Sequence, residues 1–494
     1  MSDVSASSTF CPVDRRRFVL IAAILASSMG FIDGSVVSIA TPAIRANLGA
    51  SLADAQWVSN AYLLFLSSVL LLGGAAGDRF GVRNVFGFGI ALFVAASMVC
   101  ALAPNAPFLI IARAVQGLGA AFMVPSSLAI IAKAYPKGDR GKAIGLWSAF
   151  SSLTTILGPV IGGLLLTWLG EWSWRLVFAI NLPLGGVALA MLFWLIPADQ
   201  PEAGRRLDIV GGILATGALL LLALALTGDS DGVLSRTIML ALGGVVLLIA
   251  FLLWEARTKS PMLPLGLFRH AGFSGAQALT FGLYFALAAI SFYLPMTLIS
   301  GWGATPADVS FVLLPMGLAL TVLSSPIGSL ADRYGPGPLI TIGAVIVAIA
   351  FGLMGLTAPL HNIWFVLLPL NALFGIGMSF VVSPLSTAVM TSVEDHDTGV
   401  ASGVNNAVAR VAGLFAVATM GAVAAMVFAG ALGGFAEQAV FFGEKPAVAL
   451  GADVEAARIA ATDAAFATIA YICAALSLLA AAIAWFTQER RLVR

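Results

Sequence analysis

The sequence predicts an all-α protein that crosses a membrane many times, and its composition and long apolar runs carry this prediction. Hydrophobic residues make up 60% of its 494 residues and charged residues only 10%, against about 25% charged in a soluble protein. A transmembrane helix needs about 20 mostly apolar residues. Fourteen runs meet this requirement, at residues 17–40, 56–76, 84–103, 107–132, 142–167, 173–196, 208–227, 235–255, 273–299, 308–330, 338–358, 362–391, 398–429 and 464–487.

A short charged loop occurs twice and indicates a duplicated membrane domain. Gly-x-x-x-Asp-Arg-Phe-Gly at 74–81 returns as Gly-x-x-x-Asp-Arg-Tyr-Gly at 328–335, and a Gly-rich stretch at 113–119 is echoed at 371–377. The same order in both places predicts parallel halves. The loop residues that we expect to control conformational switching are Gly74, Asp78, Arg79, Gly81, Arg83, Asp332 and Arg333.

Two of the apolar runs, 208–227 and 235–255, have no counterpart in either repeat. The expected architecture is therefore two six-helix bundles with two extra central helices. The domain boundaries that we expect are a cytoplasmic tail at 1–14, a six-helix bundle at 15–197, two linker helices within 198–260, and a second bundle at 261–494 with an outside loop at 430–463.

The positions of the basic residues predict the orientation. Cytoplasmic loops collect Lys and Arg. Most of the 25 Lys and Arg residues, beginning with Arg15, Arg16 and Arg17, fall in one set of loops, which places both termini in the cytoplasm. The formal net charge of +1 gives no reason to expect a nucleic acid as a partner. The expected partner is the lipid bilayer.

Asp33 is the one acidic residue that we place well inside a span. A buried carboxylate is costly, so an intramembrane acid is a functional candidate, although it can also be a structural partner for an arginine. Arg113, with Gln116 on the same helix face, lies inside span four and is the expected counterpart. The residues leave open whether the two charges pair directly or through water or substrate.

Span five carries a stretch of small and helix-bending residues, Gly158, Pro159, Gly162 and Gly163. Proline removes a helix hydrogen bond and permits a bend. Such a helix suits two bundles that rock against each other, but static close packing explains the glycines nearly as well.

Several polar and aromatic residues inside spans are candidates for a substrate cavity. They are Gln116, Tyr284, Tyr293, Asn405, Asn406 and Arg410. Aromatic walls suit flat or lipophilic substrates, although ordinary packing accounts for most aromatics of span nine. Arg410 has no evident acidic partner in its own half.

The sequence offers no catalytic or metal-binding pattern. Cys11, Cys100 and Cys473 lack disulfide or metal-ligand spacing, and His270, His361 and His396 lie far apart. A membrane enzyme, which needs a nucleophile with a base, is therefore disfavoured, and no cofactor is expected. No Gly-x-x-x-x-Gly-Lys-Ser/Thr motif is present, so ATP is not the expected energy source.

Taken together, these motifs resemble the major facilitator superfamily, and in particular its fourteen-helix drug:proton antiporter branch. The resemblance covers about residues 15–490. It rests on the loop at 74–81, on 113–119, on Gly-Pro-x-x-Gly-Gly at 158–163, on Trp174-Arg175 with Asn181-x-Pro-x-Gly, and on Asp33 in Asp-Gly-Ser-Val-Val.

The resemblance implies the major facilitator fold and a secondary transporter in the bacterial plasma (inner) membrane. Such a protein would export small lipophilic, drug-like compounds in exchange for protons. Asp33 and Arg113 would couple the two movements, the loop at 74–83 and its repeat would switch conformation, and 158–163 would form the antiporter helix.

A transporter of the same fold for one specific metabolite is the alternative, and an accessory periplasmic protein is left open. Two features depart from the family pattern. Val82 stands where the family often has a basic residue. The second half has no clear mid-membrane acid, and this absence argues against a doubly charged cation as substrate.

Overall fold

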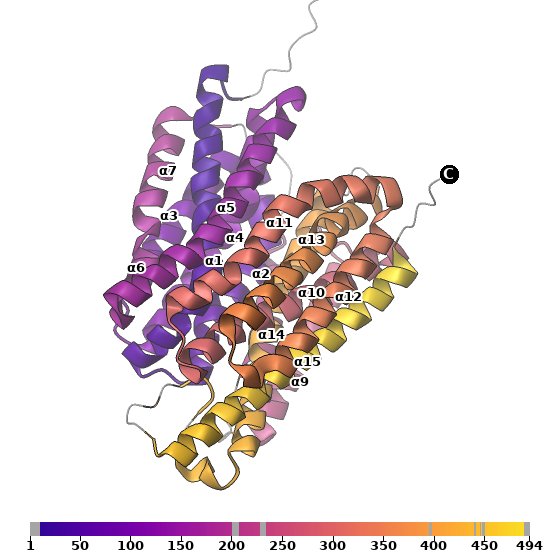
Figure 1. Cartoon of the computed structure of the whole chain (residues 1–494). Coiled ribbons are helices and arrows are strands. Elements are labelled where there is room, and N and C mark those ends of the chain that lie inside the picture. The colour runs from indigo at the N-terminus through magenta and orange to yellow at the C-terminus, as the bar shows by residue number, and fades with distance from the viewer. Residues whose placement is uncertain are drawn as a thin grey trace, which may run out of the picture.

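The computed structural model describes residues 10–199, 207–227, 234–394, 398–438, 441–444, 446 and 450–488. Within these ranges the regular structure is helical, and fourteen helices are long and apolar enough to cross a membrane (Figure 1). The expected all-α membrane fold is thus confirmed. Residues 1–9 of the expected tail lie outside the described residues, as do Arg205, Arg206, His396 and Lys445.

The first half of the chain forms six spans, the sixth of which consists of two consecutive helices that meet at Ile180. Its helices are α1 (Arg16–Leu48), α2 (Leu52–Phe80), α3 (Val82–Ala101), α4 (Ala106–Ala134), α5 (Lys137–Leu169), α6 (Trp174–Ala179) and α7 (Asn181–Leu195). Ser51 and Asp54 form a capping box at the start of α2, which satisfies N–H groups that have no partner inside the helix.

The second half repeats this arrangement, including the capping box. Its helices are α10 (Ala271–Met296), α11 (Pro306–Tyr334), α12 (Pro336–Thr357), α13 (Leu368–Thr391), α14 (Thr398–Leu432) and α15 (Ala452–Thr487). Thr305 and Asp308 cap α11 as Ser51 and Asp54 cap α2. In Figure 1 the indigo-to-magenta helices of the first half lie beside the orange-to-yellow helices of the second.

The loop before α15 is shorter than the expected outside loop at 430–463, because α15 already begins at Ala452. Its first turns carry the charged residues Asp453, Glu455 and Arg458. Their low hydropathy is why the sequence predicted the start of this span only at residue 464. Arg458 is buried, pairs with Glu455 at 2.7 Å and donates to the carbonyl oxygens of Ser300 and Gly301. These bonds explain how a charged segment extends the helix.

The extra helices are α8 (Ile209–Leu226) and α9 (Leu234–Glu255). α8 packs where α2 meets α14, in a small core that includes Leu64, Leu219 and Leu414. Asp208 caps α8 through the backbone N–H of Gly211 and also accepts from the indole N–H of Trp254, which ties the two helices together. The other side of α9 is largely exposed and apolar, as a lipid-facing helix is.

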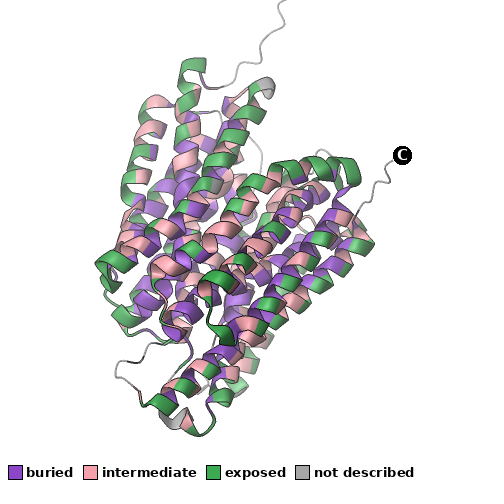
Figure 2. Cartoon of the chain, in the orientation of Figure 1, coloured by how far each residue is buried: buried purple, intermediate pink, exposed green. Residues whose placement is uncertain are grey.

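The two halves join at one end of the bundle and separate at the other. We call the end where α1 begins the basic end, because Arg15, Arg16 and Arg17 lie there. The largest apolar core contains residues of both halves, such as Ile44 and Met296, and lies towards the opposite end. At the basic end each half has a core of its own, and Figure 2 shows the buried residues concentrated where helices face each other.

Direct hydrogen bonds reinforce the junction between the halves. Ser310 of α11 donates to the carbonyl oxygen of Pro159 in α5 at 2.7 Å. Gln56 of α2 donates to the carbonyl oxygen of Val417 in α14 at 2.9 Å and to the hydroxyl of Tyr293 in α10 at 2.8 Å. The structure is therefore a state in which the halves are closed at the end opposite to the basic end.

The basic end is predicted to face the cytoplasm, and cysteine labelling tests this orientation. Asp14 and Glu171 are exposed at opposite ends, and the three native cysteines are buried. We expect an impermeant thiol reagent added to intact cells to label Glu171→Cys but not Asp14→Cys. Permeabilised cells should label both variants, and the reverse pattern in intact cells would contradict the orientation.

Candidate functional site

A buried ion pair joins α1 to α4. Asp33 lies near the middle of α1 and is fully buried, and Arg113 lies about two turns into α4 and is 2% exposed. Nη1 of Arg113 is 2.6 Å from Oδ2 of Asp33. The pairing is therefore direct. Removing either partner would leave an uncompensated buried charge, which is far more costly than losing an exposed pair.

Three further contacts hold the Arg113 guanidinium in place. Its Nε donates to the carbonyl oxygen of Val58 in α2 at 2.9 Å. Its central carbon lies 4.3 Å from the ring centroid of Tyr62 and 5.6 Å from that of Phe178. A cation over an aromatic face is stabilised by the negative face of the ring, so these two rings add to the contacts that hold the guanidinium in this position.

Gln116, expected in a substrate cavity, bonds to both members of the ion pair. Its Nε2 donates to Oδ1 of Asp33 at 3.0 Å, and its Oε1 accepts from Nη1 of Arg113 at 2.7 Å. Both oxygens of Asp33 therefore accept hydrogen bonds, which is the pattern that suits an ionised carboxylate.

The network continues into α3 and to the junction of α6 and α7 in the sixth span. Nε2 of Gln116 lies 3.3 Å from the Ser97 hydroxyl, to which Nδ2 of Asn181 also donates, at 2.9 Å. Ser97 in turn donates to the carbonyl oxygen of Phe178. The sequence indicated Asn181 only as part of a family motif and gave no role to Ser97 or Tyr62. Their one signal is polarity within an apolar span.

Glycines in α4 allow the close helix contacts on which this network depends. A Cβ atom on Gly117 would lie 3.1 Å from the carbonyl carbon of Tyr62, and one on Gly119 would lie 2.8 Å from the Cα atom of Phe93. Neither site has room for a side chain, so the backbones of α2, α3 and α4 approach closely. This approach brings the carbonyl oxygen of Val58 within reach of Arg113.

The span-five glycines lie at contacts between α5 and two other helices. A Cβ on Gly158 would be 3.2 Å from the Cα atom of Ile32, and Gly162 faces the side chain of Val36 in α1. Gly163 packs against the backbone of Pro306 in α11. Pro159 contributes the carbonyl oxygen that accepts from Ser310. Gly163 and Pro159 therefore form part of the contact between the halves, whereas Gly158 and Gly162 pack α5 against α1 within the first half.

The other cavity candidates are not gathered in one place. Tyr293 is fully buried and bonded to Gln56 and Val417 at the junction of the halves. Asn405 accepts from the Thr280 hydroxyl, whereas Asn406 is exposed. Tyr284 and Arg410 are half-buried. Sequence analysis did not select Gln56. Its polarity at the start of the second apolar run was the available signal.

The first switch loop lies at the basic end. Gly74 approaches Pro125 of α4, and Gly81, with φ of 88°, makes the turn between α2 and α3 in a conformation that favours glycine. Asp78 is half-buried in the last turn of α2, and the Arg79 side chain is exposed and lies over the ring of Phe80. The loop is thus a tight turn with its charges at the surface of the bundle.

Asp199, just beyond α7, anchors this loop and was not found from the sequence. Its two oxygens accept from the backbone N–H groups of Val82 and Arg83 at the start of α3, each at 2.9 Å, and Lys133 of α4 lies 3.6 Å away. The Arg83 side chain donates to the carbonyl oxygens of Leu192 and Phe193. A carboxylate at a helix N-terminus is stabilised by the free N–H groups and by the helix dipole.

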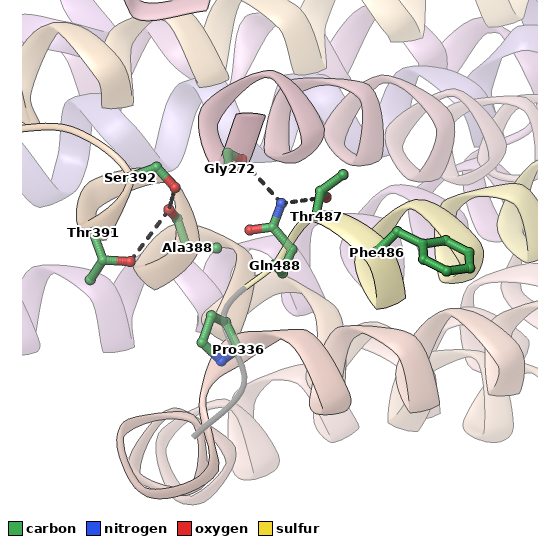
Figure 3. Close-up of a pocket in the computed structure, with 8 residues that line it drawn as sticks. All are labelled: Gly272, Pro336, Ala388, Thr391, Ser392, Phe486, Thr487 and Gln488. Carbon is green, nitrogen blue, oxygen red and sulfur yellow. Dashed lines mark hydrogen bonds between the residues drawn. The ribbon is translucent and has the colours of Figure 1, made fainter. Parts of the chain in front are cut away.

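The second switch loop has no such anchor among the described residues. Gly335, with φ of 81°, repeats the turn of Gly81, and Asp332 and Arg333 are exposed on the last turn of α11. Beside it lies a cavity of about 260 Å³. Figure 3 shows its lining, in which the carboxamide of Gln488 donates to the carbonyl oxygen of Gly272. Thr391 stands there at the repeat position of Lys133.

Two repeated bundles of membrane-length helices, with a buried ion pair between α1 and α4 of the first bundle, are typical of a membrane transporter. No group of three or more potential metal ligands occurs within the described residues. The family model of the Major Facilitator Superfamily matches residues 22–417. The chain belongs to this superfamily, and it is a transporter and not an enzyme.

Similar proteins include several resistance proteins. The chain is 35% identical to the methylenomycin A resistance protein of Bacillus subtilis, over 82% of this chain and 87% of that protein. It is 34% identical to the puromycin resistance protein pur8 of Streptomyces alboniger (86% and 85%) and 32% identical to the tetracenomycin C resistance and export protein of Streptomyces glaucescens (82% and 75%).

Solved structures share the fold at low identity. A bacterial homologue of the human lysosomal transporter Spinster, in an inward-facing and unoccupied conformation, superposes with a TM-score of 0.66 at 16% identity, covering 97% of this chain and 99% of that one. The xylose transporter XylE from E. coli, in an inward-open conformation, gives 0.62 at 16% identity, with 96% and 97% coverage.

Substitution of Asp199 should destabilise the first half. Asp199→Asn removes the negative charge from the start of α3 and its attraction to Lys133, and we expect a loss of about 1–2 kcal/mol in the free energy of unfolding, the upper range for a partly buried charge at a helix terminus. Thermal unfolding of the purified protein in detergent measures it. Asp14→Asn, at an exposed site, is the matched control, and equal unfolding temperatures for the two variants would contradict the role of Asp199.

Asp78 is predicted to control switching between conformations rather than substrate choice. A carboxylate in the last turn of α2 needs donors from neighbouring segments, and these segments move when the halves rock. Asp78→Asn should slow exchange across proteoliposome membranes while equilibrium substrate binding stays within about twofold of wild type. Asp332→Asn should have a smaller effect. Lost binding with a normal exchange rate per bound substrate would overturn this role.

Proposed function

We propose that this transporter exports small lipophilic, drug-like compounds across the bacterial plasma membrane in exchange for protons. The observation that carries the proposal is the fully buried Asp33 carboxylate held by Arg113 and Gln116. Coupling to protons needs a group that changes its charge inside the membrane. Among the described residues, Asp33 is the carboxylate that lies in the middle of a span with a cation as its partner.

The geometry suggests how protonation would act on the conformation. A proton on Asp33 removes the counter-charge of Arg113 and displaces a hydrogen-bond donor, which raises the free energy of the present arrangement. A second arrangement in which Arg113 has other partners is then favoured, and the equilibrium between the two states shifts. Proton binding and substrate binding would thus favour different states, which produces exchange.

The names of the relatives support the direction of transport. They include a resistance protein for methylenomycin A, one for puromycin, and an export protein for tetracenomycin C. With the basic end in the cytoplasm, the structure faces inward, the state from which an exporter takes up its substrate. The energy source would be the proton gradient, with no bound cofactor.

Asp33→Asn should abolish proton-driven accumulation. The amide resembles a permanently uncharged carboxyl group, so it cannot bind and release a proton in each cycle. Everted vesicles with an imposed pH gradient, supplied with methylenomycin A, tetracenomycin C or puromycin, measure uphill uptake and proton release. We expect uptake by Asp33→Asn to fall at least tenfold, whereas downhill exchange persists.

Charge-conserving variants sharpen this test. Asp33→Glu should retain part of the activity with a shifted pH profile, and Arg113→Lys should be milder than Arg113→Ala because it keeps the positive charge. Asp14→Asn serves as the exposed control. Accumulation by Asp33→Asn equal to wild type would remove Asp33 from the mechanism.

A further inference from the structure

Arg410 lies deep in α14 on the face that points to the first half. Three glycines of α14 define this face: Gly403 approaches Leu71, Gly413 approaches Leu63, and Gly421 meets Gln56, all on α2. Arg410 follows Gly403 by seven residues, two helical turns, and therefore shares the face. The guanidinium is within electrostatic reach of the Tyr62 hydroxyl on α2 and of the Tyr284 hydroxyl on α10.

Among the described residues, no acidic side chain pairs with Arg410. Within the described part of the chain, its side chain makes no ion pair and no hydrogen bond. Asp33 is committed to Arg113 and Gln116. Asp463, on α15, accepts from Trp302 and contacts His361 at 2.8 Å. An arginine in the middle of a membrane normally faces water or pairs with a counter-charge. Arg410 is half-buried, so part of its side chain is open to the surroundings and can meet an anion.

The middle of the protein consequently carries excess positive charge. The Asp33–Arg113 pair is neutral in sum, which leaves the charge of Arg410 uncompensated at the contact between α2 and α14. Nearby helices also present buried amides without partners, Asn60 on α2 and Gln277 on α10. Gln277 lies one turn before Thr280, which donates to Asn405 of α14, and therefore belongs to the α14-facing side of α10.

We propose that Arg410 binds an anionic group of the transported compound, so that the substrates are lipophilic acids rather than lipophilic cations. The inference rests on the proposed export function and names its substrate class. A guanidinium presents several donors in a plane and pairs well with carboxylates and other oxyanions. The same charge repels a cation.

The charge of the substrate sets the driving force. If an anion leaves while a proton enters, both movements carry positive charge inward. A membrane potential that is negative inside then drives export together with the pH gradient. With a singly charged cation exchanged for one proton, the net charge moved would be zero and the potential would contribute nothing.

Two xanthene dyes of opposite charge test the proposal by equilibrium binding. Fluorescein is an anion and rhodamine 123 is a cation on the same ring system, and fluorescence anisotropy with purified transporter in detergent reports the dissociation constant of each. We expect wild type to bind fluorescein at least tenfold more tightly than rhodamine 123. Equal affinities, tighter binding of rhodamine 123, or no measurable binding of fluorescein would overturn the proposal.

Variants at Arg410 assign the preference to this residue. Arg410→Gln should weaken fluorescein binding at least tenfold and leave rhodamine 123 binding unchanged or improved, whereas Arg410→Lys should keep a preference for the anion. Arg269→Gln makes the same change of charge at an exposed site at the basic end and should match wild type. Unfolding temperatures identify any Arg410 variant that is misfolded, and a folded Arg410→Gln with wild-type preference refutes the assignment.

The Asp33→Asn variant separates this inference from the proposed function. It should lose proton-driven accumulation but retain the preference for fluorescein, because binding at Arg410 does not require coupling. A wild-type protein that prefers fluorescein but moves no protons would contradict the proposed function alone. Proton-coupled export of puromycin without any preference for fluorescein would contradict the substrate class alone.

Discussion

The ion pair between Asp33 and Arg113 is the interaction on which the arrangement of the first half depends. Two charges in a low-dielectric interior attract strongly but are costly to desolvate, and the cost is offset only when the remaining donors and acceptors are also satisfied. Gln116, the carbonyl oxygen of Val58 and the ring of Tyr62 provide this satisfaction. The network therefore draws α1, α2 and α4 together, and through Ser97 and Asn181 it reaches α3 and α7.

The second constraint on the structure is the close approach of helix backbones at glycine positions. Gly117 and Gly119 allow α4 to approach its neighbours, and Gly421 leaves the space that Gln56 occupies between α2, α10 and α14. The bonds of Gln56 to Tyr293 and Val417 join the halves at the end opposite to the basic end. Opening that end requires these bonds to break together, so the contact is suited to two discrete states rather than to gradual deformation.

Much of the fold could be predicted from the sequence, because spans and loops follow from transfer of apolar segments into lipid. The fourteen spans and the two matching turns are of this kind. The start of α15 could not be predicted in this way, since the charges of Asp453, Glu455 and Arg458 find partners only in the folded protein. The contacts of the candidate site could not be predicted either, because its partners also come together only in the folded protein.

Asp33 and Arg113 were evident from the cost of buried charge, but that cost does not say which neighbours satisfy them. Gln116 and Tyr293 look alike as polar groups within spans, yet one bonds to the ion pair and the other bridges the halves. Asp199 lies far from α3 in the sequence, and only the tertiary contact brings it there. Sequence patterns predicted the elements, and long-range contacts decided the roles.

The two halves satisfy the free N–H groups at the start of their third helix in different ways. In the first half Asp199 occupies the free N–H groups of α3, whereas α12 begins Pro336-Gly337-Pro338, and two of its first three residues have no N–H group to satisfy. The second half thus needs no anchoring carboxylate and leaves a cavity beside Gln488. Because the start of α12 does not depend on such a carboxylate, substitutions in the terminal turns of α13 and α15 should cost less stability than the loss of Asp199.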